Sequence, residues 1–271
     1  MSDPTGFDLE AYLERVGYTG DREPSHAALA ALHLAHATHI PFENLDVLLR
    51  QPIRLDLESL QAKMVRGGRG GYCFEQNTLF AAALDQLGFS VRRLAARVRA
   101  RAHRVLPRTH MLLLVDIGVS GDGGTWLADV GFGAEGLLLP VPFGDRQEAR
   151  QFAWTYRVVA EEPGLWVLQS LRGDIWEDLY AFTHEPQKPI DYEMAHYYTS
   201  THPESRFLHT LTVQLAAPEG RRILRDRELL LDRGTLVTSR PIADDEEFLA
   251  VLAETFGLRF PPGTRFRYDP L

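Results

Sequence analysis

The apolar and polar positions of the chain change their spacing twice along its length. Up to about residue 88, apolar residues recur every three or four positions, which is the period of a helix with one buried face. From there to about residue 190 they alternate with polar residues, and short glycine-containing turns separate the runs, as in an antiparallel sheet or barrel. The remaining residues mix both patterns. The spacing therefore predicts a helical, a strand-rich and a mixed part in succession, with no repeat or linker to sharpen their boundaries.

Individual elements follow from the same spacing and from residues that start or stop helices. Pro24 and Ser25 start one helix, Asp56 caps another, and Gly88 ends a third. The helical spacing predicts helices over residues 7–16, 26–39, 57–65, 74–87, 191–198 and 245–256. The alternation predicts strands over residues 94–98, 111–117, 126–130, 156–159, 165–171, 175–182 and 211–215, and further strands up to Ile242. A turn is expected over residues 118–124.

Composition and charge narrow the class of protein. The 271 residues are 45% hydrophobic and 24% charged, which is ordinary for a globular protein with a substantial core. The formal net charge of −8 argues against a general affinity for nucleic acid or anionic membrane. A single cysteine allows no internal disulfide, and the sequence shows no leader-like segment and no apolar run near the ~18 residues of a membrane span. These features predict a soluble, reduced, cytoplasmic protein.

Three histidines on the second predicted helix raise the question of a metal site. His33, His36 and His39 are spaced i, i+3, i+6, so they drift around the helix, and no nearby cysteine completes a ligand set. We therefore expect no metal there and interpret the three histidines as a polar helix face.

The single cysteine, Cys73, lies where a glycine-rich turn meets the start of a helix. Gly70 and Gly71 allow the backbone to approach another group closely, and a helix N-terminus favours thiolate over thiol. Glu75 and Asn77 follow at once and are expected to orient partners or cap the helix. A lone cysteine is often only a small buried hydrophobe, but a structural cysteine needs none of these neighbours. The arrangement favours a reactive thiol.

A nucleophilic cysteine needs a base within hydrogen-bonding reach and a group that orients the base. His110 opens the otherwise apolar run of residues 111–115, and Asp129 lies at the end of another run that leads into a glycine-containing segment. Taken alone, each has a structural explanation, as a satisfied strand-end histidine and as a turn residue. If the two strands are neighbours, the carboxylate orients the imidazole and the imidazole faces Cys73. The sequence therefore indicates a site of these three residues.

The motifs around these residues resemble those of a known family. The chain resembles the arylamine N-acetyltransferase family over residues 40–45, 69–77, 109–111, 129–133 and 200–207. The resemblance implies that Cys73, His110 and Asp129 form a catalytic triad in a cysteine-protease-like catalytic core. It also implies an α+β fold in three parts, a helical bundle (1–88) carrying the cysteine, an antiparallel β-barrel (89–190) carrying the histidine and aspartate, and an α/β lid (191–271).

The same resemblance implies a ping-pong reaction with acetyl-CoA as co-substrate and no metal. An acetyl-cysteine would pass its acetyl group to an arylamine, arylhydrazine or arylhydroxylamine, with the histidine moving the proton. Positions near the coenzyme in relatives correspond to Thr109, Gly131, Gly133 and Phe207. Positions that line an aromatic pocket for the aryl ring correspond to Phe42, Tyr72 and Phe132. Supporting roles are expected for Glu43, Asn44, Glu75 and Asn77.

Three other functions use the same residues. An amide synthase of natural-product assembly keeps the fold and the triad but changes the acyl group. A cysteine hydrolase or transglutaminase-like enzyme uses the same chemistry but admits water or exchanges amides. A binding protein with an unreactive cysteine is the non-enzymatic alternative. The motifs do not specify the physiological amine, the range of acyl donors, or whether the protein is a monomer or a homodimer.

Overall fold

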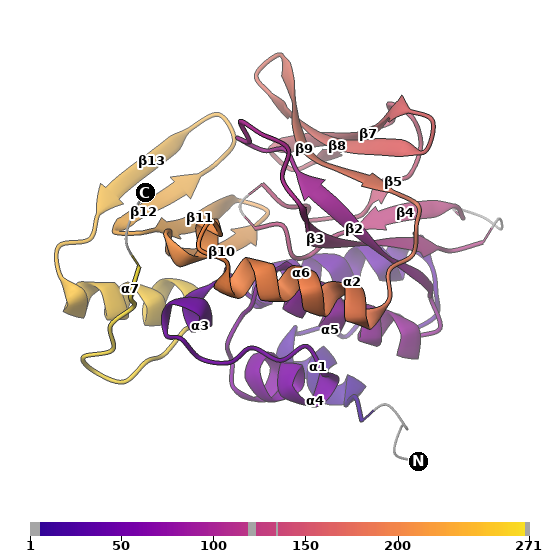
Figure 1. The fold of residues 1–271 in the computed structure, drawn as a ribbon. Helices are drawn as coiled ribbons and strands as arrows, with labels where there is room; N and C mark the ends of the chain where they lie inside the picture. Colours follow the sequence, from indigo (N-terminus) through magenta and orange to yellow (C-terminus); the bar gives the residue numbers. More distant parts are fainter. Residues whose placement is uncertain (1–5, 119–122, 134, 269–271) are drawn as a thin grey trace.

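The computed structural model describes residues 6–118, 123–133 and 135–268, and Figure 1 shows their helices packed against two antiparallel sheets. The N-terminal helices lie along one side of the larger sheet, α6 (Pro189–Thr201) crosses the front, and α7 (Asp245–Phe256) lies below the smaller sheet. None of the described helices is both long enough and apolar enough to cross a membrane.

The N-terminal part is helical, as its spacing predicts. Its helices are α1 (Leu9–Arg15), α2 (His26–His39), α3 (Leu45–Leu48), α4 (Leu57–Leu60), a π-helix (Gln61–Arg66) and α5 (Cys73–Gln86). The helix predicted over residues 57–65 is therefore a short α-helix that continues as a π-helix, a change of hydrogen-bond register that apolar spacing does not reveal. The helix α5 begins one residue earlier than predicted, so that Cys73 is its first residue.

The strand-rich part forms one antiparallel sheet of eight strands, in the order β5, β4, β3, β2, β9, β8, β7, β6. Its strands are β2 (Ser90–Val98), β3 (Arg108–Asp116), β4 (Thr125–Ala128), β5 (Val141–Pro142), β6 (Glu148–Gln151), β7 (Trp154–Glu162), β8 (Leu165–Arg172) and β9 (Ile175–Thr183). The segment that follows the edge strand β5 approaches β7, next to the other edge, where the Arg146 N–H donates to the Val158 carbonyl at 2.8 Å. The sheet is therefore nearly closed. Residues 119–122, in the turn predicted after β3, lie outside the described residues.

The strand β3 is buried on both faces. Met111, Leu113 and Val115 pack into the core shared with the helices, whereas Leu112 and Leu114 pack into the interior of the larger sheet. A strand covered on both sides has no polar face, so a continuous apolar run replaces the alternation that was expected here.

The strands β3 and β4 are neighbours, which His110 and Asp129 require in order to meet. The strand β4 ends at Ala128, two residues earlier than predicted. The chain leaves the sheet there because Val130 N–H donates to the side-chain oxygen of Asn77 on α5 at 3.2 Å. Asp129 is thereby turned toward the N-terminal end of α5.

The second sheet has five antiparallel strands in the order β1, β10, β11, β12, β13. Its strands are β1 (Phe42–Glu43), β10 (Thr212–Ala217), β11 (Gly220–Arg225), β12 (Glu228–Asp232) and β13 (Val237–Pro241). Its edge strand β1 comes from the N-terminal part, where the sequence predicted only a turn after Pro41. The helix α7 packs Phe248, Leu252 and Phe256 into the core under this sheet, as predicted, and ends at Gly257 with φ of 73°.

The helix α6 connects the two sheets and is longer than the predicted span of residues 191–198. It starts earlier because the Asp191 carboxylate accepts the Lys188 N–H at 2.7 Å and Pro189 fits the first turn. The Tyr192 hydroxyl donates to the Leu94 carbonyl at 3.1 Å, which fixes α6 against the larger sheet.

Candidate active site

The turn before Cys73 is pressed against two other parts of the chain. A Cβ atom on Gly70 would lie 1.9 Å from the Pro41 carbonyl oxygen, and one on Gly71 would lie 2.7 Å from a carboxylate oxygen of Glu75. Only glycine fits at these two positions. The close approach predicted for the paired glycines is therefore confirmed, and in the structure it is an approach to protein atoms.

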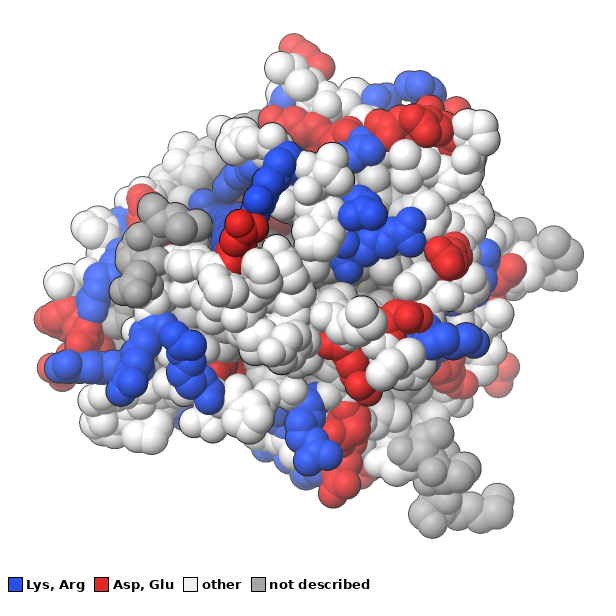
Figure 2. All heavy atoms as spheres, viewed as in Figure 1, with Lys and Arg blue, Asp and Glu red and all other residues white. Residues whose placement is uncertain are grey.

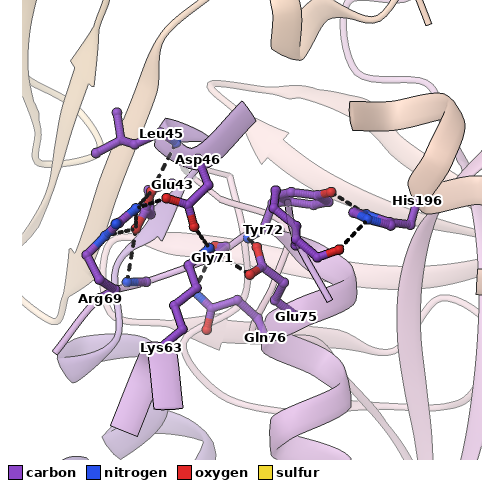
Figure 3. A network of polar contacts seen from close by, with 12 residues as sticks. Glu43, Leu45, Asp46, Lys63, Arg69, Gly71, Tyr72, Glu75, Gln76 and His196 are labelled. Atoms are coloured by element: carbon purple, nitrogen blue, oxygen red, sulfur yellow. Dashed lines mark hydrogen bonds and ion pairs between the residues drawn. The ribbon is translucent and has the colours of Figure 1, made fainter. Parts of the chain in front are cut away.

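A network of buried charges surrounds this turn (Figure 3). Lys63 Nζ lies 2.7 Å from Asp46 and 2.7 Å from Glu75, and Arg69 bridges Glu43 and Asp46 at 2.8 Å each. Burial alone would lower the pKa of Lys63, but the neighbouring carboxylates outweigh it and raise that pKa well above its usual value. The network joins the π-helix, the strand β1 and the start of α5.

Two of these carboxylates also hold the backbone of the turn. Glu75 accepts the Tyr72 N–H at 3.1 Å, and Glu43 accepts the Gly70 N–H at 3.2 Å. Both bonds satisfy donors ahead of the first turn of α5. Glu43 and Glu75 were expected to support the site. In the structure they hold the backbone before Cys73 and so fix the position of this residue.

The structure brings together the three residues of the predicted catalytic site. Cys73 is 4% exposed, and its Sγ lies 3.6 Å from the carbonyl oxygen of Thr109, the residue before His110. His110 Nε2 lies 2.6 Å from the Oδ2 atom of Asp129. Because Nε2 is engaged by the carboxylate, Nδ1 is the ring nitrogen left for the thiol.

Charge and burial act in opposite directions on this pair. Burial alone would lower the pKa of His110, but the charge of Asp129 and the bond to it, together with Cys73, raise that pKa to about 10. Burial alone would raise the pKa of Asp129, but His110 and the hydrogen bonds from Asn77 and Gly131 lower it overall. At neutral pH the imidazole therefore carries a proton beside an ionised aspartate.

The second oxygen of the Asp129 carboxylate is held in place as well. Asn77 Nδ2 donates to Oδ1 at 2.9 Å and the Gly131 N–H donates to it at 3.0 Å. A Cβ atom on Gly131 would lie 2.7 Å from the Cα atom of Cys73, so this glycine lets the Asp129 segment pass directly over the start of α5. Asn77 thus ties α5, β3 and the Asp129 segment together, since it also donates to the Met111 carbonyl at 2.8 Å.

Two histidines of α2 lie in the core, which corrects the interpretation of a polar helix face. His33 and His36 are fully buried. His33 Nε2 accepts the Asp129 N–H at 3.1 Å, so Nδ1–H must donate to the Leu138 carbonyl at 3.0 Å. Burial lowers the pKa of His33 to about 4 and that of His36 to about 3. The spacing argument expects only apolar residues on the buried face of a helix. It was wrong here because an imidazole whose two nitrogens are both hydrogen-bonded can also be buried there.

The expectation that no metal is bound stays a prediction. In the described part of the chain, no group of three or more His, Cys, Asp or Glu side chains is arranged to hold a metal ion.

Cys73 and His110 open into a pocket of about 320 Å³. Most of the residues predicted to bind substrate or coenzyme line it. They are Phe42, Thr109, Gly131, Phe132 and Phe207. The Phe132 ring stands edge-on to the His110 ring at 5.0 Å, and the Phe42 ring is edge-on to Phe207 at 6.1 Å. The catalytic end of the pocket is therefore aromatic.

Comparisons with known proteins agree with this geometry. A family model described as N-acetyltransferase matches residues 26–264. The arylamine N-acetyltransferase of Mycolicibacterium smegmatis is 38% identical over 257 residues, which cover 93% of this chain and 92% of that protein. The solved arylamine N-acetyltransferase of Salmonella typhimurium matches with a TM-score of 0.88 and 33% identity, over 98% of this chain and 96% of that one. The chain belongs to the arylamine N-acetyltransferase family.

Membership in the arylamine N-acetyltransferase family makes this chain an acyltransferase and confirms the resemblance read from its motifs. A further similar structure is that of the Mycobacterium marinum arylamine N-acetyltransferase in complex with CoA. It matches with a TM-score of 0.86 and 33% identity, over 92% of each chain.

Two residues that the arylamine N-acetyltransferase resemblance assigned to binding lie elsewhere. Tyr72 is fully buried, and its hydroxyl donates to His196 Nδ1, away from the pocket. Tyr72 is the N-cap residue of α5, and its ring packs edge-on against the lining residue Phe207 at 5.2 Å. Gly133 has φ of 91° and packs against the side chain of Gln214, where a Cβ atom would lie 2.5 Å from the amide oxygen. Neither residue is among those that line the pocket.

The charged residues of the pocket were not predicted from the sequence. Its lining includes Arg101, Arg104, Arg206 and Arg225. Nothing in the sequence distinguishes these four from the other members of a set of 29 Lys and Arg residues. Only the fold, by bringing the β2–β3 connection, the end of α6 and the strand β11 to one place, shows that they share a pocket with Cys73.

Proposed function

We propose that this protein moves an acetyl group from acetyl-CoA to an arylamine, arylhydrazine or arylhydroxylamine through an acetyl-Cys73 intermediate. The observation that carries the proposal is the placement of Cys73, His110 and Asp129. The thiol begins a helix, faces an imidazole bonded to a carboxylate at 2.6 Å, and lies at the aromatic end of a pocket. Nucleophile, base and orienting group are thus all present.

In the first half-reaction the Cys73 thiolate attacks the thioester carbonyl carbon. A C–S bond forms, and the carbonyl electrons move to oxygen, where the backbone N–H groups at the start of α5 stabilise the charge. When the carbonyl re-forms, the bond to the CoA sulfur breaks. The His110 imidazolium gives its proton to the departing thiolate, which leaves as CoA–SH, and Asp129 keeps the imidazole oriented throughout.

In the second half-reaction the amine nitrogen attacks the acetyl-Cys73 carbonyl. Aromatic amines are weakly basic, so at neutral pH their lone pair is free. Neutral His110 takes the proton that the nitrogen loses, and the C–S bond to Cys73 breaks. The products are the N-acetylated amine and the starting imidazolium–thiolate pair.

The pocket fits both substrates of this reaction. Phe42 and Phe132 line the pocket beside Cys73 and are proposed to contact the aryl ring, and the lining residues Thr109, Gly131 and Phe207 are proposed to contact the pantetheine arm. We leave Tyr72 and Gly133 out of this assignment because their side chains and backbone face other parts of the protein.

Intact mass spectrometry tests the proposal. We expect one acetyl increment on the wild-type protein after incubation with acetyl-CoA, none on Cys73→Ala, and loss of the increment when 4-anisidine is added, with acetyl-anisidine formed in equal amount. No increment with acetyl-CoA would overturn the choice of donor and favour an amide synthase that uses other thioesters. An increment lost as fast without the amine as with it would favour a hydrolase.

A further inference from the structure

Four arginines line the pocket of Cys73, and two of them are neutralised within the protein. Arg101 forms an ion pair with Glu135 at 3.1 Å, and Arg104 forms one with Glu204 at 2.8 Å. Each carboxylate also belongs to the pocket lining. Both arginines therefore have a carboxylate partner within the protein, and Glu135 is shared with Arg172 at 3.6 Å.

The other two, Arg206 and Arg225, have no such partner. Within the described residues, neither guanidinium forms an ion pair within 4.0 Å or a hydrogen bond to a protein group. The Nε atom of Arg225 is buried without a hydrogen-bond partner. A buried guanidinium donor that lacks an acceptor is costly, so its position is explained best by an acceptor that comes from outside the protein.

The two unpaired arginines lie close enough to affect each other. Arg206 is exposed, and partial desolvation together with the charges of Arg225 and Arg101 lowers its pKa, while Asp226 and Glu135 act in the opposite direction. Like charges held together in a pocket favour a bound anion. This positive charge is local, because the chain has a net charge of −8 and acidic and basic side chains are interspersed over the face seen in Figure 2.

We propose that Arg206 and Arg225 form a binding site for the phosphate groups of the acyl-CoA donor. The proposal rests on the proposed function, which brings a CoA thioester into this pocket. Guanidinium groups bind phosphate oxygens through paired N–H donors, and CoA carries a diphosphate and a 3′-phosphate. Arg206 follows α6 in a 3₁₀ turn (Arg206–Leu208) and Arg225 ends β11, so neither comes from the elements that carry Cys73, His110 and Asp129.

Comparison of two acyl donors tests the site. Acetyl-pantetheine has the reacting thioester of acetyl-CoA but no diphosphate and no 3′-phosphate. We expect Arg206→Met and Arg225→Met each to raise the KM for acetyl-CoA about tenfold, and to leave the kinetics with acetyl-pantetheine within about twofold of wild type. Dephospho-acetyl-CoA then shows whether the 3′-phosphate or the diphosphate is bound.

The matched control is Arg222→Met. Arg222 lies on the same strand as Arg225 and does not line this pocket, so it removes the same charge without removing a phosphate contact. Its KM for acetyl-CoA should stay within about twofold of wild type. Equal effects of Arg206→Met and Arg225→Met on both donors, or no effect on either, would overturn the proposal.

Direct binding separates this proposal from the proposed function. Calorimetry with CoA itself needs no acyl transfer, and the double variant Arg206→Met/Arg225→Met should bind CoA about a hundredfold more weakly than wild type. If the wild type binds CoA and the double variant does not, while no acetyl-Cys73 forms, then the anion site stands and the proposed reaction fails. If the wild type and the double variant bind CoA with equal affinity, the anion site is refuted, whether or not acetyl-Cys73 forms.

Discussion

At the scale of single residues, Asp129 is held through its backbone as well as through its carboxylate. The carboxylate is bonded by His110, Asn77 and the Gly131 N–H, and the Asp129 N–H donates to His33 at 3.1 Å. His33 therefore positions the residue that orients His110, although it touches neither Cys73 nor the pocket.

Two substitutions of His33 separate its two hydrogen bonds. The amide of Gln reaches the place of Nε2 and can accept the Asp129 N–H, whereas the amide of Asn reaches only the place of Nδ1 and can donate to Leu138. We expect His33→Asn to slow acetylation of Cys73 about tenfold and to shift the pH profile of its alkylation by iodoacetamide. His33→Gln should stay within about threefold of wild type. Coincident pH profiles of the two folded variants would show that the bond to Asp129 has no effect on the site.

The candidate catalytic residues could be predicted from sequence because chemistry restricts their types and positions. Cys73 lies two residues after a pair of glycines, at a helix start, and His110 opens an apolar run. The role of His33 could not be predicted, because periodicity does not show whether a polar side chain finds partners in the core. The assignment of Tyr72 to the aryl pocket came from the family resemblance, which does not show that its hydroxyl bonds His196 or that it is absent from the pocket lining.

At the scale of elements, buried ion pairs rather than apolar packing alone fix the N-terminal end of α5. Lys63 on the π-helix lies between Asp46 and Glu75, whose side chains are 12% and 1% exposed. Glu75 in turn caps α5 through the Tyr72 N–H. Loss of the lysine would leave both carboxylates without their shared partner.

We expect Lys63→Met to lower the free energy of unfolding by about 3 to 5 kcal/mol, because removing one partner of a buried ion pair leaves an uncompensated charge. Urea unfolding measures this loss. The matched control is Lys188→Met, which removes the other lysine of the chain from an exposed position and should cost less than about 0.5 kcal/mol. Adding Glu75→Gln to Lys63→Met should restore part of the stability. Equal losses for the two lysine variants would contradict this account of the network.

The elements themselves were predicted best where one face is buried. The last helix was placed correctly because its apolar stripe and Gly257 agree. The helix over residues 57–65 was predicted, but its change to a π-helix was not, and the edge strand β1 was expected only as a turn, because apolar spacing shows neither a π-helical register nor a two-residue strand. The division into three domains, 1–88, 89–190 and 191–271, stays a prediction, although β1 shows that the first segment supplies a strand to the last sheet.

At the scale of the whole molecule, the two buried histidines make stability depend on pH. The pKa values of His33 and His36 fall from 6.5 to about 4 and about 3 on burial. Below pH 6.5, His33 and His36 bind protons in the unfolded chain but stay neutral in the folded chain. The free energy of unfolding therefore decreases as the pH falls toward 4. His110 does not offset this loss, because its pKa is raised to about 10 and its stabilising effect is already complete below pH 6.5.

When the pH is lowered from about 7 to about 5, each of these two histidines should therefore reduce the free energy of unfolding by about 2 kcal/mol. Urea unfolding at the two pH values measures the loss, and His33→Gln, which does not titrate there, should lose about 2 kcal/mol less than wild type. A variant that loses as much stability as the wild type over this interval would show that His33 is not the group that takes up the proton.

The pairing of β1 with β10 also sets the order in which the protein can be completed during synthesis. The Thr212 N–H bonds the side chain of Asn44, 168 positions earlier in the chain. The strand β1 therefore stays without its partner strand until nearly four-fifths of the polypeptide has been translated. Cys73 emerges well before His110 and Asp129, so the nascent chain carries a thiol whose imidazole and carboxylate partners have yet to be translated.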